Sequence, residues 1–444
     1  MCWTTWSAAI SISEAFQSFL SNIAVDNTET IALRYGEITR ALNIRFRDTE
    51  SKTANTLQVG SYGRGTAIKG ISDLDILYIM PSRSWPDYKD GRQLQLLRDT
   101  ADAIRARYPN TDVRVDRLVV QVLYARFQVE VQPVFEEADG SFTYPDTSSG
   151  GSWKTTRPRE ELRAISDADM AKNRNVRRLC KMVRAWKNKH GVAMGGLLID
   201  SLAHRFLNGT GYYDDKSYVY YDYMARDLFE FLGSLPDQEY FAALGSGQRV
   251  KVKKKFQKKA RNAHKLCLEA IEANEAGNRN EKWRKVFGRG FPAAAEEASK
   301  AFILEGNYQA RNTEEIIENK FPVDIRYPIT LDCEVRQHGF RSFLLRSMLL
   351  DRLPLFTRKS LRFFVAEHGI PGRFQLYWKV LNRGTEAVRR DCIRGQIVLG
   401  NAGLEKTENT MFRGEHVVEC YAVQNHVVVA TDRIRVPIQE ASED

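Results

Sequence analysis

The stretch GSYGRGTAIKGISDLDILYIM, from Gly60 to Met80, decides the fold of this chain. A glycine-rich turn leads into an apolar run that is typical of a buried β-strand, and two acidic residues stand where that strand begins. Residues i and i+2 of a strand project to the same face, about 6.6 Å apart, and their neighbours project to the other face. We therefore expect Asp73 and Asp75 to lie side by side while Leu74 and Ile76 face the core.

The two aspartates pose an electrostatic problem, because converging carboxylates repel each other and the pKa of one of them rises. A divalent cation removes the conflict, and Mg²⁺ commonly binds through one or two carboxylates together with the phosphates of a substrate. A D-x-D motif at the start of a strand is therefore consistent with a Mg²⁺–nucleotide site. The alternative is a solvated turn, which is the more common context for an isolated D-x-D motif.

The glycines at the start of the stretch provide a second observation. Gly60, Gly63, Gly65 and Gly70 permit close approach of a ligand to the backbone, and Ser61 offers a hydroxyl group and a backbone N–H to phosphate oxygens. The spacing matches neither a Walker loop nor a dinucleotide-binding fingerprint. The alternative interpretation is a flexible hairpin loop without a ligand.

A third observation comes from the segment FQVEVQPVF, which starts at Phe127. Its first apolar residues alternate with Gln128, Glu130 and Gln132, which share the opposite face of the predicted strand. If this strand pairs beside the D-x-D strand, Glu130 becomes the third carboxylate of a two-metal site. Two metal ions about 3.5–4 Å apart can clamp the attacking and leaving oxygens of an in-line phosphoryl displacement. The alternative is an edge strand with a solvated face.

The composition bounds the class of protein. The chain has 444 residues, 43% of them hydrophobic, which suggests two or three domains. A formal net charge of +10 fits a nucleotide, a nucleic acid or an acidic membrane as ligand, although a generally basic soluble protein carries the same signal. The six cysteines are scattered without zinc-binding spacing, so we expect reduced thiols in a cytoplasmic protein. No apolar run approaches the roughly 18 residues that a membrane-spanning helix needs.

The first part of the chain mixes helices and strands. Helical periodicity runs from Trp3 to about Ala54, and a further helix is expected over Gln93–Tyr108. The segments VRVDRLVVQVLYARF and QVEVQPVF are each predicted to form a strand. The Gly/Ser/Thr/Pro-rich segment DGSFTYPDTSSGGSW is predicted to be a loop.

The remainder changes from helical to β-rich. Residues 158–302 are mostly helical in pattern and include the amphipathic segment NVRRLCKMVRAWKNK and the basic run VKVKKKFQKKARNAHK. Short alternating segments dominate from about Phe321 onward. The segment VVECYAVQNHVVVATDRIRVPI predicts two strands joined by a turn at Gln424 and Asn425.

Together, these features resemble the nucleotidyltransferase fold of the DNA polymerase β superfamily. The resemblance is closest to the cyclic GMP–AMP synthase-like and oligoadenylate synthase-like enzymes, especially the bacterial cGAS/DncV-like nucleotidyltransferases (CD-NTases) of anti-phage CBASS systems. The residues that carry it are Gln58–Asp75, Glu130–Pro133 and Asn173–Phe206. The segments FPVDIRYPITLDCEV, YWKVLNRG and FRGEHVVECY resemble the sensor-type (AGS-C-like) domain appended to bacterial second-messenger synthetases. Glu130 departs from the family pattern, which usually has aspartate as the third carboxylate.

The resemblance implies an α+β fold with three parts. Residues 1–157 would form a polymerase β-like catalytic domain with N-terminal helices, and residues 158–317 a helical lobe that completes the nucleotide cleft. Residues 318–444 would form a β-rich, sensor-like C-terminal domain.

The resemblance also implies the chemistry. Asp73, Asp75 and Glu130 would bind two Mg²⁺ ions, with Mn²⁺ as a substitute, and Glu130 would help to deprotonate the acceptor hydroxyl. A ribose hydroxyl of one NTP, with ATP expected among the substrates, would attack the α-phosphate of another, and ring closure would give a cyclic di- or trinucleotide for a separate effector protein. The implied nucleotide-binding residues are Gln58, Gly60, Ser61, Lys181 and Arg184.

Two groups of basic residues can each be interpreted in two ways. Lys181 and Arg184 are three residues apart on a helix and share a face, which is either a phosphate-binding face or an ordinary solvated one. The run Lys251–Lys259 could bind nucleic acid, but Phe256 is its only aromatic residue, so a solvated basic helix face is favoured. No membrane partner is expected.

Two other functions compete with the cyclic synthase. A linear oligoadenylate or RNA-tailing nucleotidyltransferase would use the same residues and differ only in its product. A non-catalytic nucleotide or nucleic-acid sensor on the same fold would be expected to lack carboxylates, whereas all three are present in this sequence.

Overall fold

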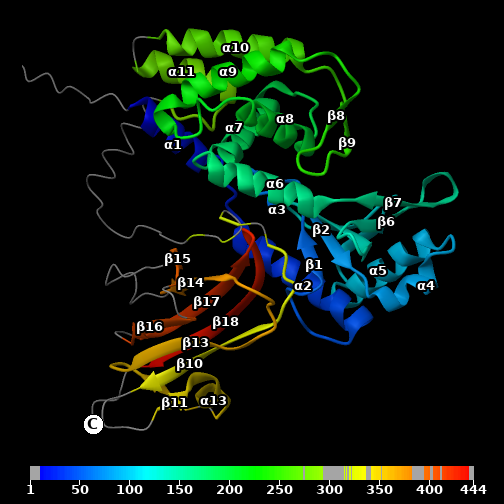
Figure 1. Cartoon of the computed structure of the whole chain (residues 1–444), viewed down its shortest axis with the longest axis vertical. Helices are drawn as coiled ribbons and strands as arrows, with labels where there is room; N and C mark the ends of the chain where they lie inside the picture. Colours follow the sequence, from blue (N-terminus) through cyan, green and yellow to red (C-terminus); the bar gives the residue numbers. More distant parts are fainter. Residues whose placement is uncertain are drawn as a thin grey trace, which may run out of the picture. The chain divides into compact units, whose positions relative to one another are not determined.

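The computed structural model of the chain consists of two compact units, residues 1–307 and 308–444, which we describe separately (Figure 1). It describes residues 11–273, 276–293, 315, 317, 320, 321, 323–336, 342–351, 353–382, 395–400, 404–410 and 413–439. Residues 3–10 of the predicted N-terminal helical segment lie outside this set. The predicted α+β class is confirmed, and the boundary at residue 157 within the first unit stays a prediction.

A seven-stranded sheet forms the centre of the first unit, with the order β1-β2-β5-β4-β3 and the β6–β7 hairpin attached to β5. Only β2 and β5 pair in parallel; the other pairs are antiparallel. The strands are β1 (Thr56–Gln58), β2 (Asp73–Ile79), β3 (Asp112–Val115), β4 (Val120–Leu123), β5 (Gln128–Glu136), β6 (Phe142–Asp146) and β7 (Ser152–Thr156).

Two sequence predictions in this sheet are wrong. The segment VRVDRLVVQVLYARF is a hairpin and not one strand, because the polar Asp116 and Arg117 begin a tight turn in which the Asp116 N–H donates to the Val119 carbonyl at 2.9 Å. The predicted loop DGSFTYPDTSSGGSW contains β6 and the start of β7, and only its Ser/Gly centre is a turn. The buried Asp146 accepts two hydrogen bonds of 2.8 Å from Arg117, which join this hairpin to the turn between β3 and β4.

Two helices cover one face of the sheet. α2 (Thr28–Arg47) and α5 (Gln93–Arg107) bury their apolar stripes against it, as the helical spacing of these residues predicts. The shared core includes Ile31, Ile38, Leu42, Leu96 and Ile104 from the helices. The sheet supplies Leu74, Ile76, Tyr78, Val129 and Val131 to the same core.

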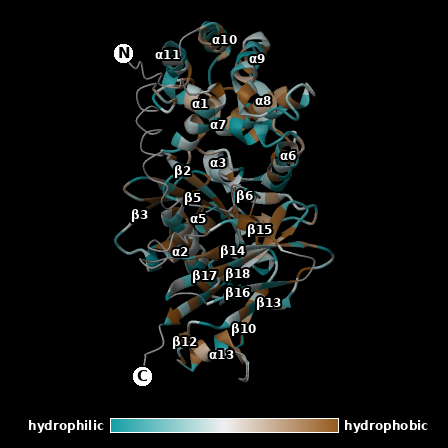
Figure 2. Cartoon of the chain, turned by 90° about the vertical axis from the view of Figure 1, so that its left-hand side faces the viewer, coloured by the Kyte–Doolittle hydropathy of each residue, from teal (hydrophilic) through white to brown (hydrophobic). Residues whose placement is uncertain are grey.

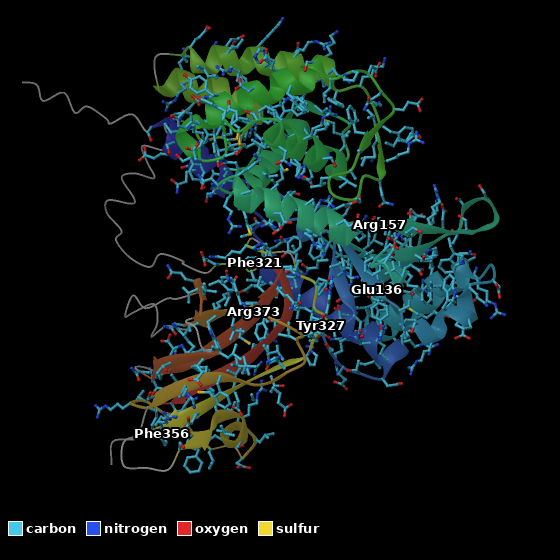
Figure 3. All side chains as sticks on the ribbon, in the orientation of Figure 1. Glu136, Arg157, Phe321, Tyr327, Phe356 and Arg373 are labelled. Carbon is cyan, nitrogen blue, oxygen red and sulfur yellow. The ribbon has the colours of Figure 1, made fainter. Side chains whose placement is uncertain are left out.

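The helical lobe of this unit encloses a second core and contacts the opposite face of the sheet through α6. Its helices are α1 (Ile12–Asn22), α6 (Pro158–Ala171), α7 (Asn175–His190), α8 (Gly196–Asn208), α9 (Tyr221–Ser234), α10 (Gln257–Ile271) and α11 (Ala276–Phe287). Leu162 of α6 packs with Leu57, Leu77, Val134 and Phe142 on the sheet. Arg157, labelled in Figure 3, directly precedes α6 at the end of β7.

Short elements complete the first unit. They are the turn helix α3 (Gly60–Gly63), η1 (Ser82–Ser84), α4 (Trp85–Tyr88), η2 (Ser148–Gly150), η3 (Tyr218–Tyr220) and the hairpin of β8 (Tyr240–Ala242) and β9 (Arg249–Lys251). Among the residues that the structure describes, no helix combines the length and the apolar character needed to cross a bilayer.

The second unit is β-rich, as predicted, and contains two sheets. One has the order β11-β10-β13-β16 and the other β12-β18-β17-β14-β15. Residues from both sheets pack into one hydrophobic core, and several of the strands are largely brown, the colour of hydrophobic residues, in Figure 2. The elements are β10 (Ile329–Arg336), β11 (Phe343–Leu344), α13 (Leu345–Leu350), β12 (Leu355–Phe356), β13 (Ser360–His368), β14 (Gln375–Leu381), β15 (Ile397–Leu399), β16 (Glu405–Asn409), β17 (Gly414–Gln424) and β18 (Val427–Gln439).

The predicted C-terminal hairpin is present with its turn shifted by one residue. β17 and β18 pair antiparallel, and the two residues between them are Asn425 and His426. Both have positive φ, 50° and 60°, the conformation that a two-residue turn requires when it follows the right-handed twist of its strands.

Candidate active site

Strand pairing brings the third carboxylate beside the other two. β2 and β5 are parallel neighbours, and their register sets Asp75 opposite Glu130 and Asp73 opposite Gln128. Leu74 and its apolar neighbours lie in the core, so the acidic side chains project from the other face, the one toward α6. The faces and the pairing predicted from the sequence are therefore confirmed.

Burial and mutual repulsion perturb the carboxyl groups of Asp75 and Glu130. The pKa of Asp75 is raised from 3.8 to about 6, first by burial and then by Glu130, with Asp73 adding to the rise and Arg64 opposing it. The pKa of Glu130 is also raised, first by burial, and hydrogen bonds from neighbouring amides act against the rise. Asp73 is exposed, whereas Asp75 and Glu130 are partly buried, so the site is not a solvated turn.

The donor set fits a hard divalent cation. Asp73, Asp75 and Glu130 form no ion pair with any lysine or arginine in the described part of the chain, although most buried carboxylates elsewhere do. Oxygen-only ligands of this kind suit Mg²⁺, and a cation would relieve the repulsion that raises the pKa of Asp75. Within the described residues, no three acidic, histidine or cysteine side chains are already gathered into a metal-binding cluster.

The glycine turn lies against the aspartates. Gly60 begins α3 with φ of +64°, and a Cβ atom there would lie only 1.7 Å from Oδ2 of Asp75. A Cβ atom on Gly63 would lie 2.2 Å from the carbonyl oxygen of Gln58. These two positions therefore require glycine, and they bring the backbone around Ser61 beside the acidic side chains. The segment connects two antiparallel strands, and its first residues form a helical turn.

Gln58 is not brought to the carboxylates. In the β1–β2 register it lies opposite Ile76, whose side chain belongs to the core that α2 and α5 cover. Residues directly opposite each other share a face, so the side chain of Gln58, only 5% exposed, is directed away from Asp75. The contact of Gln58 with a nucleotide therefore stays a prediction, and the β1–β2 register does not favour it.

Arg184 is buried in an ion pair instead of facing phosphate or solvent. Its guanidinium group donates to both carboxylate oxygens of Asp200, at 2.5 and 2.9 Å. Arg64, four residues after Gly60, donates to the same carboxylate at 2.8 Å, and Thr66 at 3.0 Å. This network could not be predicted from the sequence, because Asp200 lies in an apolar helical pattern. It attaches the glycine turn to α7 and α8.

We expect Asp200→Asn to lower the free energy of unfolding by about 3–5 kcal/mol, the usual cost of removing one partner of a buried ion pair. The amide would leave Arg184 without a carboxylate partner and would weaken the hold on Arg64. Urea unfolding measures the effect. Asp237→Asn in the same lobe is the control, because its partner Lys255 is exposed and the change should cost less than about 1 kcal/mol. Equal stabilities of the two variants would contradict the role of the network.

Two other lysines of α7 retain an available positive charge. Lys181 and Lys187 form no hydrogen bond or ion pair in the described residues. Burial, and next Arg177, lower the pKa of Lys181 to about 8. Burial, and then Arg184 and Lys253, lower the pKa of Lys187, while Asp73 acts in the opposite sense. Sequence reasoning named Lys181 but missed Lys187, which the three-residue spacing 181, 184, 187 could have indicated.

The basic run is not one helix face, contrary to the favoured interpretation. Lys251 ends β9, the next lysines lie in a bend, and α10 begins only at Gln257. Lys259 donates to the carbonyl oxygens of His190 and Gly191, at 2.6 and 3.2 Å, at the end of α7. Valines at alternate positions, 250 and 252, explain the strand that interrupts the helical pattern.

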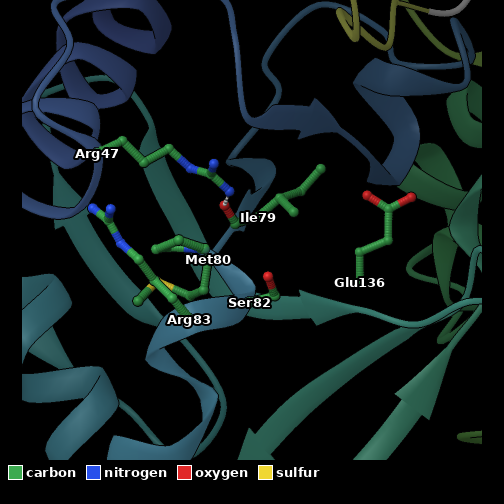
Figure 4. A pocket seen from close by; sticks show the side chains of 7 residues that line it. Arg47, Ile79, Met80, Ser82, Arg83 and Glu136 are labelled. Atoms are coloured by element: carbon green, nitrogen blue, oxygen red, sulfur yellow. Dashed lines mark hydrogen bonds between the residues drawn. The ribbon is translucent and has the colours of Figure 1, made fainter.

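A separate cavity of about 520 Å³ lies at the other end of β2. It is lined by Arg47, Ile79, Met80, Pro81, Ser82, Arg83 and Glu136, and Arg47 donates to the carbonyl oxygen of Ile79 at 2.9 Å (Figure 4). Asp73 and Asp75 stand six and four residues before Ile79, about 20 and about 13 Å along the strand. This cavity is therefore distinct from the carboxylate site.

Two family models match the chain, one in each unit. Residues 10–169 match the family described as Second Messenger Oligonucleotide or Dinucleotide Synthetase domain (SMODS). Residues 311–439 match the Adenylyl/Guanylyl and SMODS C-terminal sensor domain (AGS_C). The first match contains all three carboxylates and the glycine turn, and the second contains nearly all of the β-rich unit.

Individual proteins are also similar to this chain. The chain is 23% identical, over 266 residues, to a cyclic AMP-AMP-AMP synthase of an Acinetobacter species, covering 55% of this chain and 75% of that protein. The fold is similar to that of E. coli MS115-1 CdnC, solved in a complex with HORMA-deltaN: the TM-score is 0.50 at 14% identity, over 65% of this chain and 100% of that one. A further similar structure is the apo form of Vibrio cholerae DncV, with a TM-score of 0.46 at 12% identity, over 54% of this chain and 69% of that one.

Proposed function

We propose that this chain, a CD-NTase-type nucleotidyltransferase with a C-terminal AGS_C sensor domain, joins nucleoside triphosphates into a cyclic di- or trinucleotide second messenger. The observation that carries the proposal is the row of Asp75 and Glu130 on paired strands, next to Asp73 and the glycine turn. Similarity to a cyclic AMP-AMP-AMP synthase supports ATP as a substrate. A role in anti-phage defence, through a separate effector protein, is part of the same proposal.

The residues have separate tasks in the proposed reaction. Asp73, Asp75 and Glu130 would hold Mg²⁺, which when bound neutralises triphosphate charge and favours the deprotonated acceptor hydroxyl. The backbone around Gly60 and Ser61 would hold phosphate oxygens of the donor nucleotide. The oxygen of a ribose hydroxyl attacks the α-phosphorus. The bond between this phosphorus and the oxygen that bridges to the β-phosphate breaks, and pyrophosphate leaves. Catalysis of this kind depends on positioning and on charge stabilisation.

Cations on α7 would bind the triphosphate. The unpaired ammonium groups of Lys181 and Lys187 are the candidates, whereas Arg184 is engaged by Asp200. A lysine whose pKa is lowered by burial and by neighbouring cations gains most from a phosphate partner, because the anion relieves both costs.

The test is product analysis with the full chain. We expect purified protein with Mg²⁺ and ATP, or with all four NTPs, to release pyrophosphate and to form a product without a terminal phosphate. Phosphatase resistance and mass spectrometry identify a ring, and nucleases specific for one linkage identify the hydroxyl that attacks. A phosphatase-sensitive ladder would instead establish a linear oligonucleotide synthase, and the absence of pyrophosphate would contradict the proposed activity.

A further inference from the structure

Glu130 occupies the middle of a row of side chains across three strands. Asp75 of β2 lies opposite it on one side, and Gln121 of β4 lies opposite it on the other. Gln128 precedes it by two residues on β5 and therefore projects from the same face. The carboxylate thus stands between an acidic neighbour and two amides.

Both amides bind the same oxygen. The Nε2 atom of Gln128 donates to Oε1 of Glu130 at 2.9 Å, and Nε2 of Gln121 donates to it at 3.2 Å. Within the described residues, Oε2 receives no hydrogen bond and neither oxygen forms an ion pair. One oxygen of the carboxylate is therefore fixed by the protein and the other is left for a ligand.

The chemistry of the two donors suits a metal ligand. An arginine or lysine at either position would neutralise Glu130 and compete with a bound cation, whereas a neutral amide orients the carboxylate and leaves its negative charge intact. The side-chain length matters as well. The extra methylene of Glu130, compared with aspartate, extends the carboxylate by about 1.5 Å, so the amides restrain a side chain that has one more rotatable bond.

We propose that Gln121 and Gln128 are positioning residues that fix Oε1 of Glu130 and so present Oε2 to a divalent cation shared with the aspartates. This inference rests on the proposed function, because it assigns a task within that active site. It also explains how this chain tolerates glutamate as its third carboxylate: the amide pair replaces the restraint that a shorter side chain has by itself.

The experiment measures metal binding directly. Mn²⁺ is titrated into the full chain in the presence of a non-hydrolysable ATP analogue, and free Mn²⁺ is followed by electron paramagnetic resonance. Substitution by methionine keeps side-chain length and removes the donor. We expect the double variant Gln121→Met/Gln128→Met to bind Mn²⁺ about 10–100-fold more weakly, the usual effect of losing the partners that orient a metal ligand.

The matched control is Gln132→Met. Gln132 lies on the same strand and face, but its amide is directed to the Leu118 carbonyl at 3.4 Å and not to Glu130. Its substitution should leave Mn²⁺ affinity unchanged. Equal affinity of the double variant and the wild type, an equal loss in Gln132→Met, or no Mn²⁺ binding by the wild type would each overturn the proposal. If the double variant does not fold, as judged by its melting temperature, Gln128→Met alone carries the test.

A second comparison separates positioning from general packing. In a Glu130→Asp background the shorter carboxylate is withdrawn from the amides, so the two methionine substitutions should cause no further loss of Mn²⁺ affinity. An undiminished loss in that background would overturn the proposal. The outcome is independent of product formation: a wild type that binds Mn²⁺ but makes no cyclic product would contradict the proposed function and leave this inference standing.

Discussion

Asp75→Asn is expected to abolish product formation and at the same time to stabilise the metal-free protein above neutral pH. The loss of activity should reach at least about 10³-fold, the scale of removing a charge-stabilising group from a phosphoryl-transfer site. The gain in stability follows from the pKa of Asp75, which rises from 3.8 to about 6 on folding. A carboxyl group with a raised pKa contributes stability below pH 4 that is lost as the pH rises through about 6.

A pKa raised from 3.8 to about 6 corresponds to a cost of about 3 kcal/mol for the ionised carboxylate. Asparagine carries no charge and avoids this cost. Urea unfolding in EDTA should therefore show Asp75→Asn more stable than the wild type at pH 8 and equal to it below pH 4. Mg²⁺ with nucleotide should stabilise only the wild type.

Asp102→Asn provides the control for both measurements. Asp102 is exposed on α5, and its one ion pair among the described residues is with the exposed Arg105, so its substitution should change neither activity nor the pH dependence of stability. If the Asp75→Asn variant were active, Asp75 would not be a residue of the active site. If the variant were inactive but less stable than the wild type at pH 8, the carboxylate of Asp75 would stabilise the fold through a contact that outweighs the repulsion from its acidic neighbours.

The sequence predicted the strands that hold the acidic residues because strand periodicity is local information. Alternation in residues 73–76 and 127–132 was enough to assign these side chains to faces, and the structure confirms both assignments. Pairing of β2 with β5 was a conditional prediction, since it depends on segments more than 50 residues apart. The polar face of β5 was the signal that favoured it, because a buried polar face needs a partner or a ligand.

The two site predictions that the structure does not favour share a physical cause. Gln58 was assigned to the site from its position in a motif, but the register of β1 sets it on the core face. Arg184 was assigned from its helix face, but Asp200 engages it from another helix. Sequence position determines the direction of a side chain along its own element, whereas its partner depends on how elements pack. Buried ion pairs between distant segments are therefore the features that local patterns cannot reveal.

Gly60→Ala is expected to reduce activity about 100-fold or more without removing any charged group. The new Cβ atom would lie 1.7 Å from Oδ2 and 2.6 Å from Cγ of Asp75, so either the carboxylate or the turn must move by more than an ångström. A displacement of about 1 Å at a site that works by positioning costs roughly 100-fold in rate. The positive φ of +64° adds about 1–2 kcal/mol of backbone strain.

Gly70→Ala separates these two effects, because Gly70 has a similar φ of +77° but no atom within 4 Å of its Cβ position. Both alanine variants should lose about 1–2 kcal/mol of stability in urea unfolding. Only Gly60→Ala should also lose turnover and Mn²⁺ affinity, because only there does the side chain reach a proposed metal ligand. If both variants lose activity equally, backbone strain in the connection from β1 to β2 is the cause. If neither does, the contact between the glycine turn and Asp75 is not needed for turnover.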